Sequence, residues 1–344
     1  MIVLTNCLAE KTDEGCLKVA NSMIPALKKS DPTLTLVSYG KKLLQCDVHI
    51  PTNKLLIGRG LWEFLLSRNE PILYIPAFAR MLPTTFRLCM LSLMSKNKVW
   101  ALLSMKSRFC LLSKLMLKVS GARVIALSNE SWQMYHALIG SRAVYLKTGV
   151  DTKRFVPVTP ERKKELRLKY GVPADKPLVL HVGHMKTGRN VLQLTCVEEN
   201  FHVVLVTSTL TEEERDANVR RKLQACRNIS LLDSYYPHIE EIYQMADVYL
   251  FPVVNESSCI DVPLSVLEAA ACGLPVVTTP FGELKQLIGK QGFYCLDSLD
   301  AENVNELLAR AVHEKKDARE SILVYDWESA ATQLLRIIKN EKQK

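Results

Sequence analysis

The stretch Leu264-Ser-Val-Leu-Glu-Ala-Ala-Ala-Cys-Gly-Leu-Pro-Val-Val277 decides the fold of this chain. Its pattern predicts a helix that begins near Pro263, ends at Gly273 and is followed by a strand over Pro275–Thr278. Proline is tolerated in the first helical turn, where its missing N–H would have no partner in any case. Glycine just past the last turn adopts the left-handed conformation that caps a helix. The stretch therefore predicts a helix–turn–strand unit of an α/β fold.

This predicted helix also carries a candidate binding site. The N–H groups at its start form a site for an anion such as phosphate, which the helix dipole favours. Glu268 lies about one turn deeper, where a carboxylate can accept hydrogen bonds from a pair of ribose hydroxyls. Together these groups outline a site for a nucleotide sugar. The alternative is an ordinary helix–turn–strand unit with no ligand.

Short apolar runs alternate with amphipathic stretches along the whole chain, which predicts parallel sheets with helices on both faces. In the first half the predicted strands are Ile2–Thr5, Leu34–Ser38, Leu55–Gly58, Ile72–Ile75, Val99–Leu103, Val124–Leu127 and Val144–Leu146. In the second half they are Leu178–Val182, Val203–Thr207, Ile229–Leu232, Val248–Phe251, Val276–Thr278 and Phe293–Cys295. Two of the predicted helices, Arg189–Glu198 and Glu283–Ile288, follow strands of the second half.

The length of 344 residues favours two domains. The proline-containing stretch Thr148–Lys176 breaks the alternation, so we place the linker there. We expect two Rossmann-like, doubly wound domains that face each other across a cleft, over residues 1–156 and 157–326. The C-terminal helix and tail, residues 327–344, are expected to pack back across the domain interface.

A glycine-containing basic turn follows the first predicted strand of the second domain. It reads Gly183-His-Met-Lys-Thr-Gly-Arg-Asn190. Ligands of doubly wound sheets bind at the carboxyl ends of strands, glycine allows the backbone to come close, and Lys186 and Arg189 can contact a diphosphate. The alternative is a simple strand-to-helix connection.

Positive charge is concentrated in the first half of the chain. Residues 1–160 hold 22 lysines and arginines against 9 acidic residues, and no acidic residue lies between Glu70 and Glu130. Such a surface favours an anionic partner. The predicted helix Arg108–Val119 mixes Phe109, Leu112 and Met116 with Lys114 and Lys118, as helices at membrane surfaces do. The alternative is a core helix with a solvated basic side, and nucleic acid is disfavoured because no binding motif is present.

Four blocks in this order resemble the family-4 retaining glycosyltransferases (glycosyl transferases group 1), which have the two-Rossmann GT-B fold. The blocks are Lys147-Thr-Gly-Val-Asp-Thr-Lys-Arg-Phe155, Val182–Asn190, Glu241-Ile-Tyr-Gln-Met-Ala-Asp-Val-Tyr-Leu-Phe-Pro252 and Leu267–Val277. The resemblance implies that a sugar moves from a nucleoside-diphosphate sugar to a glycan or lipid-linked acceptor. It also implies a place in the synthesis of cell-surface polysaccharide or glycolipid.

The resemblance assigns roles to individual residues. Glu268 would hold the donor ribose, and the N–H groups of Ser265 and Val266 would hold the diphosphate. Arg189 stands at the lysine position that binds phosphate in the family. His184 stands where the family usually has arginine, which leaves less positive charge near pH 7.

One departure from the family concerns the donor sugar. The family often has a second glutamate eight positions before the first, and here that position holds Ile260. Asp261 is adjacent and is expected to take over part of its role. The alternative for Asp261 is a carboxylate that only complements a helix dipole.

No cofactor and no metal ion are expected, because the sequence contains no Asp-x-Asp motif and no metal-like Cys/His cluster. The ten cysteines are scattered and indicate reduced thiols of a cytoplasmic protein. With the basic helix, this predicts a peripheral enzyme on the inner face of the membrane. Two alternatives stay open, namely another GT-B nucleotide-sugar enzyme such as an epimerase, and a degenerate partner subunit that binds a nucleotide without turnover.

Overall fold

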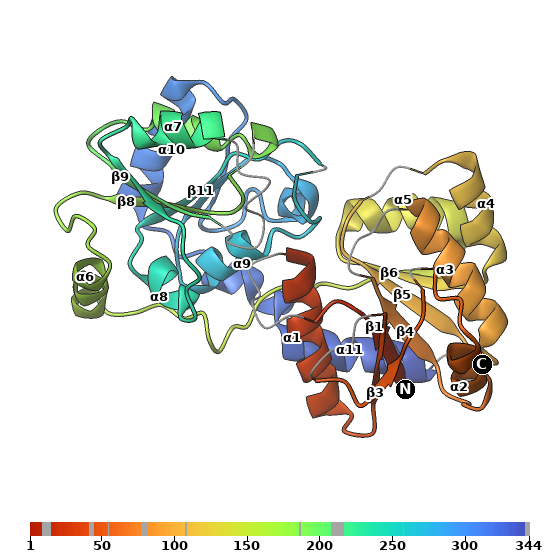
Figure 1. Ribbon diagram of the computed structural model, residues 1–344. Coiled ribbons are helices and arrows are strands. Elements are labelled where there is room, and N and C mark those ends of the chain that lie inside the picture. Colours follow the sequence, from red (N-terminus) through yellow and green to blue (C-terminus); the bar gives the residue numbers. More distant parts are fainter. Residues whose placement is uncertain are drawn as a thin grey trace. The chain divides into compact units, whose positions relative to one another are not determined.

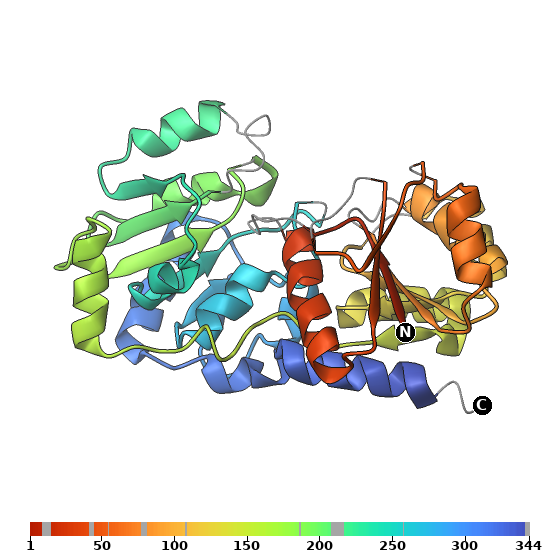
Figure 2. The same cartoon turned by 60° about the horizontal axis from the view of Figure 1, so that its bottom comes forward.

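The computed structural model describes residues 1–8, 15–40, 45–53, 55–76, 81–106, 109–185, 187–207, 217–256 and 258–340. The chain forms two compact units (Figures 1 and 2). The first comprises residues 1–148 and 327–344, and the second residues 149–326. Each unit is an α/β layer structure around its own parallel sheet.

The sheet of the first unit has seven strands in the order β3-β2-β1-β4-β5-β6-β7, all parallel. Its strands are β1 (Ile2–Thr5), β2 (Thr35–Tyr39), β3 (Val48–Ile50), β4 (Ile72–Ile75), β5 (Val99–Leu103), β6 (Arg123–Ala126) and β7 (Ala143–Tyr145). Its helices are α1 (Gly15–Ser30), α2 (Arg59–Leu66), α3 (Met81–Met94), α4 (Leu111–Val119), α5 (Asn129–Ile139) and α11 (Trp327–Asn340). β2 and β3 lie to one side of β1 and β4 to β7 lie to the other, which places the topological switch point between β1 and β4.

The C-terminal helix α11 belongs to this first unit and lies beside α1 (Figures 1 and 2). Its buried stripe consists of Trp327, Ala330, Ala331, Leu334, Leu335 and Ile338. That spacing of three and four residues forms one apolar side of a helix. The ion pair between Lys29 Nζ and Glu328 Oε1, at 2.6 Å, joins α1 and α11 at the surface.

The sheet of the second unit has six parallel strands in the order β10-β9-β8-β11-β12-β13. The strands are β8 (Leu178–Val182), β9 (His202–Val206), β10 (Ile229–Leu232), β11 (Val248–Phe251), β12 (Val276–Thr278) and β13 (Phe293–Cys295). The α-helices are α6 (Pro160–Lys169), α7 (Ala217–Gln224), α8 (Ile239–Gln244), α9 (Leu264–Ala271) and α10 (Ala301–Glu314). Here the switch point lies between β8 and β11.

The predicted strand Leu55–Gly58 is wrong, and the third strand of the first sheet is β3 instead. The Asn53 side-chain oxygen accepts hydrogen bonds from the N–H groups of Leu55 and Ile57, at 2.9 and 3.0 Å. Leu56 has a φ of 63°. These bonds form a turn, and a positive φ is incompatible with a strand.

The predicted helices Arg189–Glu198 and Glu283–Ile288 are short 3₁₀ segments. They are η2 (Thr187–Arg189), η3 (Val191–Cys196) and η5 (Gly282–Gln286). Asn190 separates the first two because it has a φ of 53°, which asparagine tolerates better than most residues. The left-handed residue keeps the segment from Thr187 to Cys196 from forming one regular α-helix.

Asp247 joins the start of β8 to α6. Its Oδ2 accepts from the Leu178 N–H at 2.7 Å and pairs with the Arg167 guanidinium, and its Oδ1 pairs with Lys163 at 3.0 Å. Burial alone would raise the pKa of Asp247, but the charges of Lys163 and Arg167 and the Leu178 amide hold it below its usual range. The aspartate of the third sequence block therefore has a structural role.

We expect Asp247→Ala to lower the free energy of unfolding by about 3 kcal/mol, because the buried Arg167 guanidinium then keeps its hydrogen bonds to the Met245 and Lys176 carbonyl oxygens but loses its carboxylate partner. Glu165→Ala, which removes an exposed pair with Arg162, should cost less than about 1 kcal/mol. Urea unfolding measures both. Since the folded-state pKa is depressed, the contribution of Asp247 is present above the unfolded pKa of about 4 and disappears as the pH falls below it. Equal losses for the two variants would contradict this role.

Candidate functional site

The candidate site lies at the switch point of the second sheet, where β8 and β11 are neighbours. In doubly wound sheets the loops that leave two such strands diverge and open a crevice at their carboxyl ends. The loop after β8 begins at Gly183, and the loop after β11 begins at Pro252 and leads into α9. Every residue predicted to bind the donor lies in these two loops or on α9.

The two loops are tied together by hydrogen bonds. Arg189 Nε donates to the Ser258 carbonyl oxygen at 2.9 Å, and Asn190 Nδ2 donates to the Pro252 carbonyl oxygen at 3.0 Å. A β-carbon placed on Gly188 would lie 2.6 Å from Ser258 Oγ. The loops are thus in close contact, and a glycine at position 188 makes that contact possible.

Arg189 lies directly over Gly183. Its side chain is buried, at 8% exposure. A β-carbon on Gly183 would lie 2.2 Å from Nη1 of Arg189 and 3.2 Å from Nε2 of His181. The structure therefore brings together Gly183 and Arg189, as the phosphate-binding prediction requires. His184 is partly buried nearby in sequence, and the predicted Lys186 lies outside the described residues.

Helix α9 begins at Leu264, with Pro263 as its N-cap. The Val266 N–H donates to the Pro263 carbonyl oxygen at 3.0 Å, so this predicted diphosphate donor is already engaged. Ser265 forms a side-chain hydrogen bond with the Tyr249 hydroxyl. That hydroxyl also bonds the backbone of Val182 at 3.2 Å, which connects the start of α9 to the end of β8. Gly273, with a φ of 81°, caps the other end as predicted.

Glu268 is buried in α9, at 5% exposure, and the Tyr243 hydroxyl donates to its Oε2 at 2.7 Å. Burial and then the charge of Glu268 raise the pKa of Tyr243 far above its usual value, so the tyrosine stays a donor. Tyr243 belongs to the third block but is not among the site residues predicted from the sequence. The bond between Tyr243 and Glu268 links the third and fourth blocks.

Asp261 and Ile260 are both buried, at 5% and 6% exposure. The Asp261 carbonyl oxygen accepts from the Glu283 N–H at 2.9 Å, and a β-carbon on Gly282 would lie 2.2 Å from that oxygen. Gly282 also has a φ of 48°. The backbone of Asp261 is therefore held by a close approach that only glycine permits.

The predicted membrane or acceptor residues lie in the first unit, on or next to α4. Lys114 and Lys118 are exposed, and Arg108 lies outside the described residues. The exposed side of α4 also carries Leu111, Leu112, Leu115 and Val119, of which Leu111 is 86% exposed. Ser113 and Leu117 form its buried side. The helix is therefore amphipathic in an unusual sense, with leucines and lysines mixed on the solvent side.

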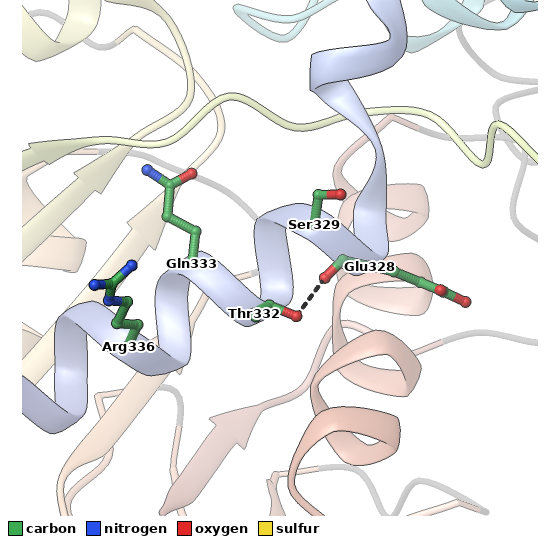
Figure 3. A pocket seen from close by; sticks show the side chains of 5 residues that line it. All are labelled: Glu328, Ser329, Thr332, Gln333 and Arg336. Atoms are coloured by element: carbon green, nitrogen blue, oxygen red, sulfur yellow. Dashed lines mark hydrogen bonds between the residues drawn. The ribbon is translucent and has the colours of Figure 1, made fainter.

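A surface hollow on the first unit is lined by Glu328, Ser329, Thr332, Gln333 and Arg336, all from α11 (Figure 3). The Thr332 hydroxyl donates to the Glu328 carbonyl oxygen at 2.9 Å. The Glu328 carboxylate is paired with Lys29. Because its lining residues come from a single helix, this hollow is a weaker candidate than the switch-point site.

In the described part of the chain, no group of three or more His, Cys, Asp or Glu residues is arranged to hold a metal ion. No described helix is long and apolar enough to cross a membrane.

Residues 177–314 match the protein family described as Glycosyl transferases group 1. The chain is 27% identical over 198 residues to the sulfoquinovosyl transferase SQD2 of Arabidopsis thaliana, covering 54% of this chain and 38% of that protein. It is 24% identical over 196 residues to a GDP-mannose-dependent monoacylated α-(1-6)-phosphatidylinositol monomannoside mannosyltransferase of Corynebacterium glutamicum, covering 53% and 50%. The chain thus spans half or less of the length of these relatives.

The fold is similar to that of the Anabaena protein HepE, whose crystal structure was solved in complex with UDP. The TM-score is 0.78, the identity 12%, and the likeness covers 98% of this chain and 99% of that one. The two Rossmann-like units are therefore those of the GT-B fold, which confirms the fold class predicted from the sequence. The match over residues 177–314 bears out the predicted family resemblance for that part of the chain.

Two glycines of the site should respond differently to substitution by alanine. Gly282→Ala should cost about 2–3 kcal/mol of unfolding free energy, because a β-carbon would meet the Asp261 backbone at a positive φ. Gly183→Ala should cost about 1 kcal/mol or less, because the displaced atom is the end of the flexible Arg189 side chain. Urea unfolding of the two variants checks the order, and a greater loss for Gly183→Ala would show that Arg189 cannot move aside.

Proposed function

Starting from residues 177–314 as a glycosyl transferases group 1 domain, we propose that this protein transfers a sugar from a nucleoside-diphosphate sugar to a glycan or lipid-linked acceptor. The reaction retains the anomeric configuration and needs no metal ion. The observation that supports the proposal is that the Tyr249 hydroxyl joins the end of β8, where the Gly183–Arg189 turn begins, to Ser265 at the start of α9, the helix that carries the buried Glu268. A carboxylate and a guanidinium at one crevice match the ribose and the diphosphate of one nucleotide.

Each residue has a role in this proposal. Tyr243 donates to Oε2 of Glu268 and orients the carboxylate, which accepts the ribose hydroxyls of the donor. Arg189, together with the start of α9 around Ser265, stabilises the negative charge that develops on the leaving diphosphate. Asp261 lies beside the transferred sugar, with its backbone fixed by Gly282 and Glu283.

The names of the relatives support the acceptor class. One relative is a sulfoquinovosyl transferase and another a mannosyltransferase that acts on a phosphatidylinositol monomannoside. The HepE structure contains UDP. We infer a role in cell-surface polysaccharide or glycolipid synthesis for this chain. An epimerase of the same fold is the second candidate enzyme, and Ile260 in place of a carboxylate favours a nucleotide-binding partner subunit as the third possibility.

The exposed face of α4 supports a location at an anionic membrane. Leu111, Leu115 and Val119 repeat at intervals of four residues, and Lys114 and Lys118 stand between them on the same exposed side. Arg142 donates to the Lys118 carbonyl oxygen at 3.1 Å, which adds a further positive charge at the end of this helix. Apolar side chains enter the lipid interface while lysines contact the headgroups. We propose a cytoplasmic protein that binds peripherally to the inner face of the membrane.

We expect one nucleoside diphosphate or its sugar to stabilise the protein by about 2.7 kcal/mol at 100 times its dissociation constant. Glu268→Gln should remove most of this stabilisation, because a carboxamide offers fewer acceptors for the ribose hydroxyls. Glu302→Gln, on α10 away from the site, is the control. Thermal unfolding with a panel of nucleotides makes the measurement.

The panel also separates the candidate functions. Transfer of radiolabelled sugar to an acceptor supports the transferase. Isomerisation of the free nucleotide sugar, with no transfer, supports the epimerase. Binding without turnover supports the partner subunit. If no nucleotide stabilises the protein, or if Glu268→Gln responds like the wild type, the site assignment is wrong.

We expect Lys114→Glu combined with Lys118→Glu to reduce binding to anionic vesicles by at least about thirtyfold, since each lysine near the surface contributes roughly 1 kcal/mol. Leu111→Ser combined with Leu115→Ser should weaken binding to the same vesicles. Leu168→Ser is a matched control, because Leu168 is an 84% exposed leucine on α6 of the second unit. Vesicle sedimentation provides the readout, and equal binding of all variants would remove α4 from the membrane contact.

A further inference from the structure

His181 is a buried histidine at the carboxyl end of β8, next to the candidate site. Its ring lies between Tyr249 and Phe251 of β11, with centroid distances of 6.3 and 6.2 Å and planes within 19° and 23° of parallel. Its side chain is fully buried. Neither the sequence blocks nor the proposed function gives this residue a role.

The proton of the ring is assigned by its hydrogen bond. Nδ1 lies 2.8 Å from the Leu250 carbonyl oxygen, and a carbonyl can only accept, so Nδ1 carries the hydrogen. Burial lowers the pKa of His181 to about 4, the Leu250 bond opposes this shift, and the charge of Arg189 adds to it. The ring is therefore neutral near pH 7, and Nε2 presents a bare lone pair.

Nε2 of His181 has no hydrogen-bond partner among the described residues. An unsatisfied buried acceptor costs roughly 1–3 kcal/mol, and such atoms in folded proteins call for an explanation. The second histidine of this sheet offers a contrast, since Nε2 of His202 on β9 lies 2.9 Å from Ser230 Oγ. Nε2 of His181 thus differs from Nε2 of His202, which has a hydrogen-bond partner.

The Arg189 guanidinium is a hydrogen-bond donor that lies near this lone pair. The β-carbon position of Gly183 is 3.2 Å from Nε2 of His181 and 2.2 Å from Nη1 of Arg189, so both nitrogens adjoin the same space. Nε of Arg189 is held by the Ser258 carbonyl oxygen. A guanidinium has five N–H donors in a fixed plane, and a terminal one that turns toward Nε2 would satisfy it.

We propose that His181 is a positioning residue, whose Nε2 accepts a terminal N–H of Arg189 and thereby sets the guanidinium for a diphosphate. This inference rests on the proposed function and assigns a second anchor to its anion site. Ser258 fixes Nε of Arg189 and His181 fixes one terminal nitrogen, so the remaining N–H groups point as a pair toward the ligand. A neutral acceptor is suited to this task, because it orients the guanidinium without cancelling its positive charge.

The test is a double-mutant cycle on ligand affinity, measured by calorimetry with the nucleoside diphosphate identified in the panel and with the matching nucleoside. His181→Phe keeps the ring between Tyr249 and Phe251 but removes the acceptor. We expect it to lower diphosphate affinity about tenfold and to leave nucleoside affinity unchanged. In an Arg189→Lys background the same substitution should have little further effect, because the lysine ammonium has no planar set of N–H groups for His181 to orient.

Two further variants separate positioning from packing. His181→Gln restores an acceptor and should recover part of the diphosphate affinity that His181→Phe loses. His202→Phe is the matched control and should alter only thermal stability. The proposal is overturned if His181→Phe leaves the ratio of diphosphate to nucleoside affinity unchanged, or if its effect is equally large in the Arg189→Lys background.

A measurement on the unaltered protein covers the case in which a variant does not fold. Nitrogen-15 spectra of the histidine side chains should show the Nδ1–H tautomer for His181 near pH 7 and a shift of Nε2 when the nucleoside diphosphate is added. An Nε2 signal that does not respond to the diphosphate, while the protein demonstrably binds it, contradicts the inference. If the wild-type protein binds no nucleotide at all, the proposed function itself fails, and with it this assignment.

Discussion

The organisation of the second unit depends on the burial of one carboxylate, Glu268. A buried carboxylate must be hydrogen-bonded to avoid a large desolvation penalty, and Tyr243 supplies that bond from the neighbouring helix α8. The same contact packs α8 against α9 and brings the third and fourth sequence blocks together. The bond therefore stabilises the packing of these two helices.

The loops at the switch point form a second level of order on this frame. Arg189 and Asn190 from the β8 loop bond carbonyl oxygens of the β11 loop, and glycines permit the close approach at positions 183, 188 and 282. A site made of two loops needs such cross-bonds, since loops alone are the most mobile parts of a fold. The His181 ring, at the end of β8, contacts the Tyr249 and Phe251 rings of β11 and so joins the two strands from which these loops begin.

Charged side chains occupy different surroundings in the two units. In the second unit Arg189 and Glu268 are both buried, and electrostatic interactions are stronger in such surroundings than in water. The first unit instead carries lysines mixed with leucines on the exposed helix α4. Arg319 illustrates the structural use of charge in the second unit: it donates to the carbonyl oxygens of Thr152 and Phe155 at 2.7 Å and also to that of Ala271. It fixes the segment that enters this unit against the end of α9.

The sequence by itself determined the alternation of strands and helices along the chain, the ends of α9 and the family blocks, because apolar periodicity and glycine or proline positions are local properties of the chain. Twelve of its thirteen predicted strands overlap those of the structure, and Leu55–Gly58 failed because an Asn53 turn and a positive φ at Leu56 override the apolar pattern. Three features follow only from the tertiary structure. They are the hydrogen bond from Tyr243 to Glu268, the bond from the Val266 N–H to the Pro263 carbonyl oxygen, and the absence of a partner for Nε2 of His181 among the described residues. Those contacts join residues from different elements, whose distance in space the linear sequence does not encode.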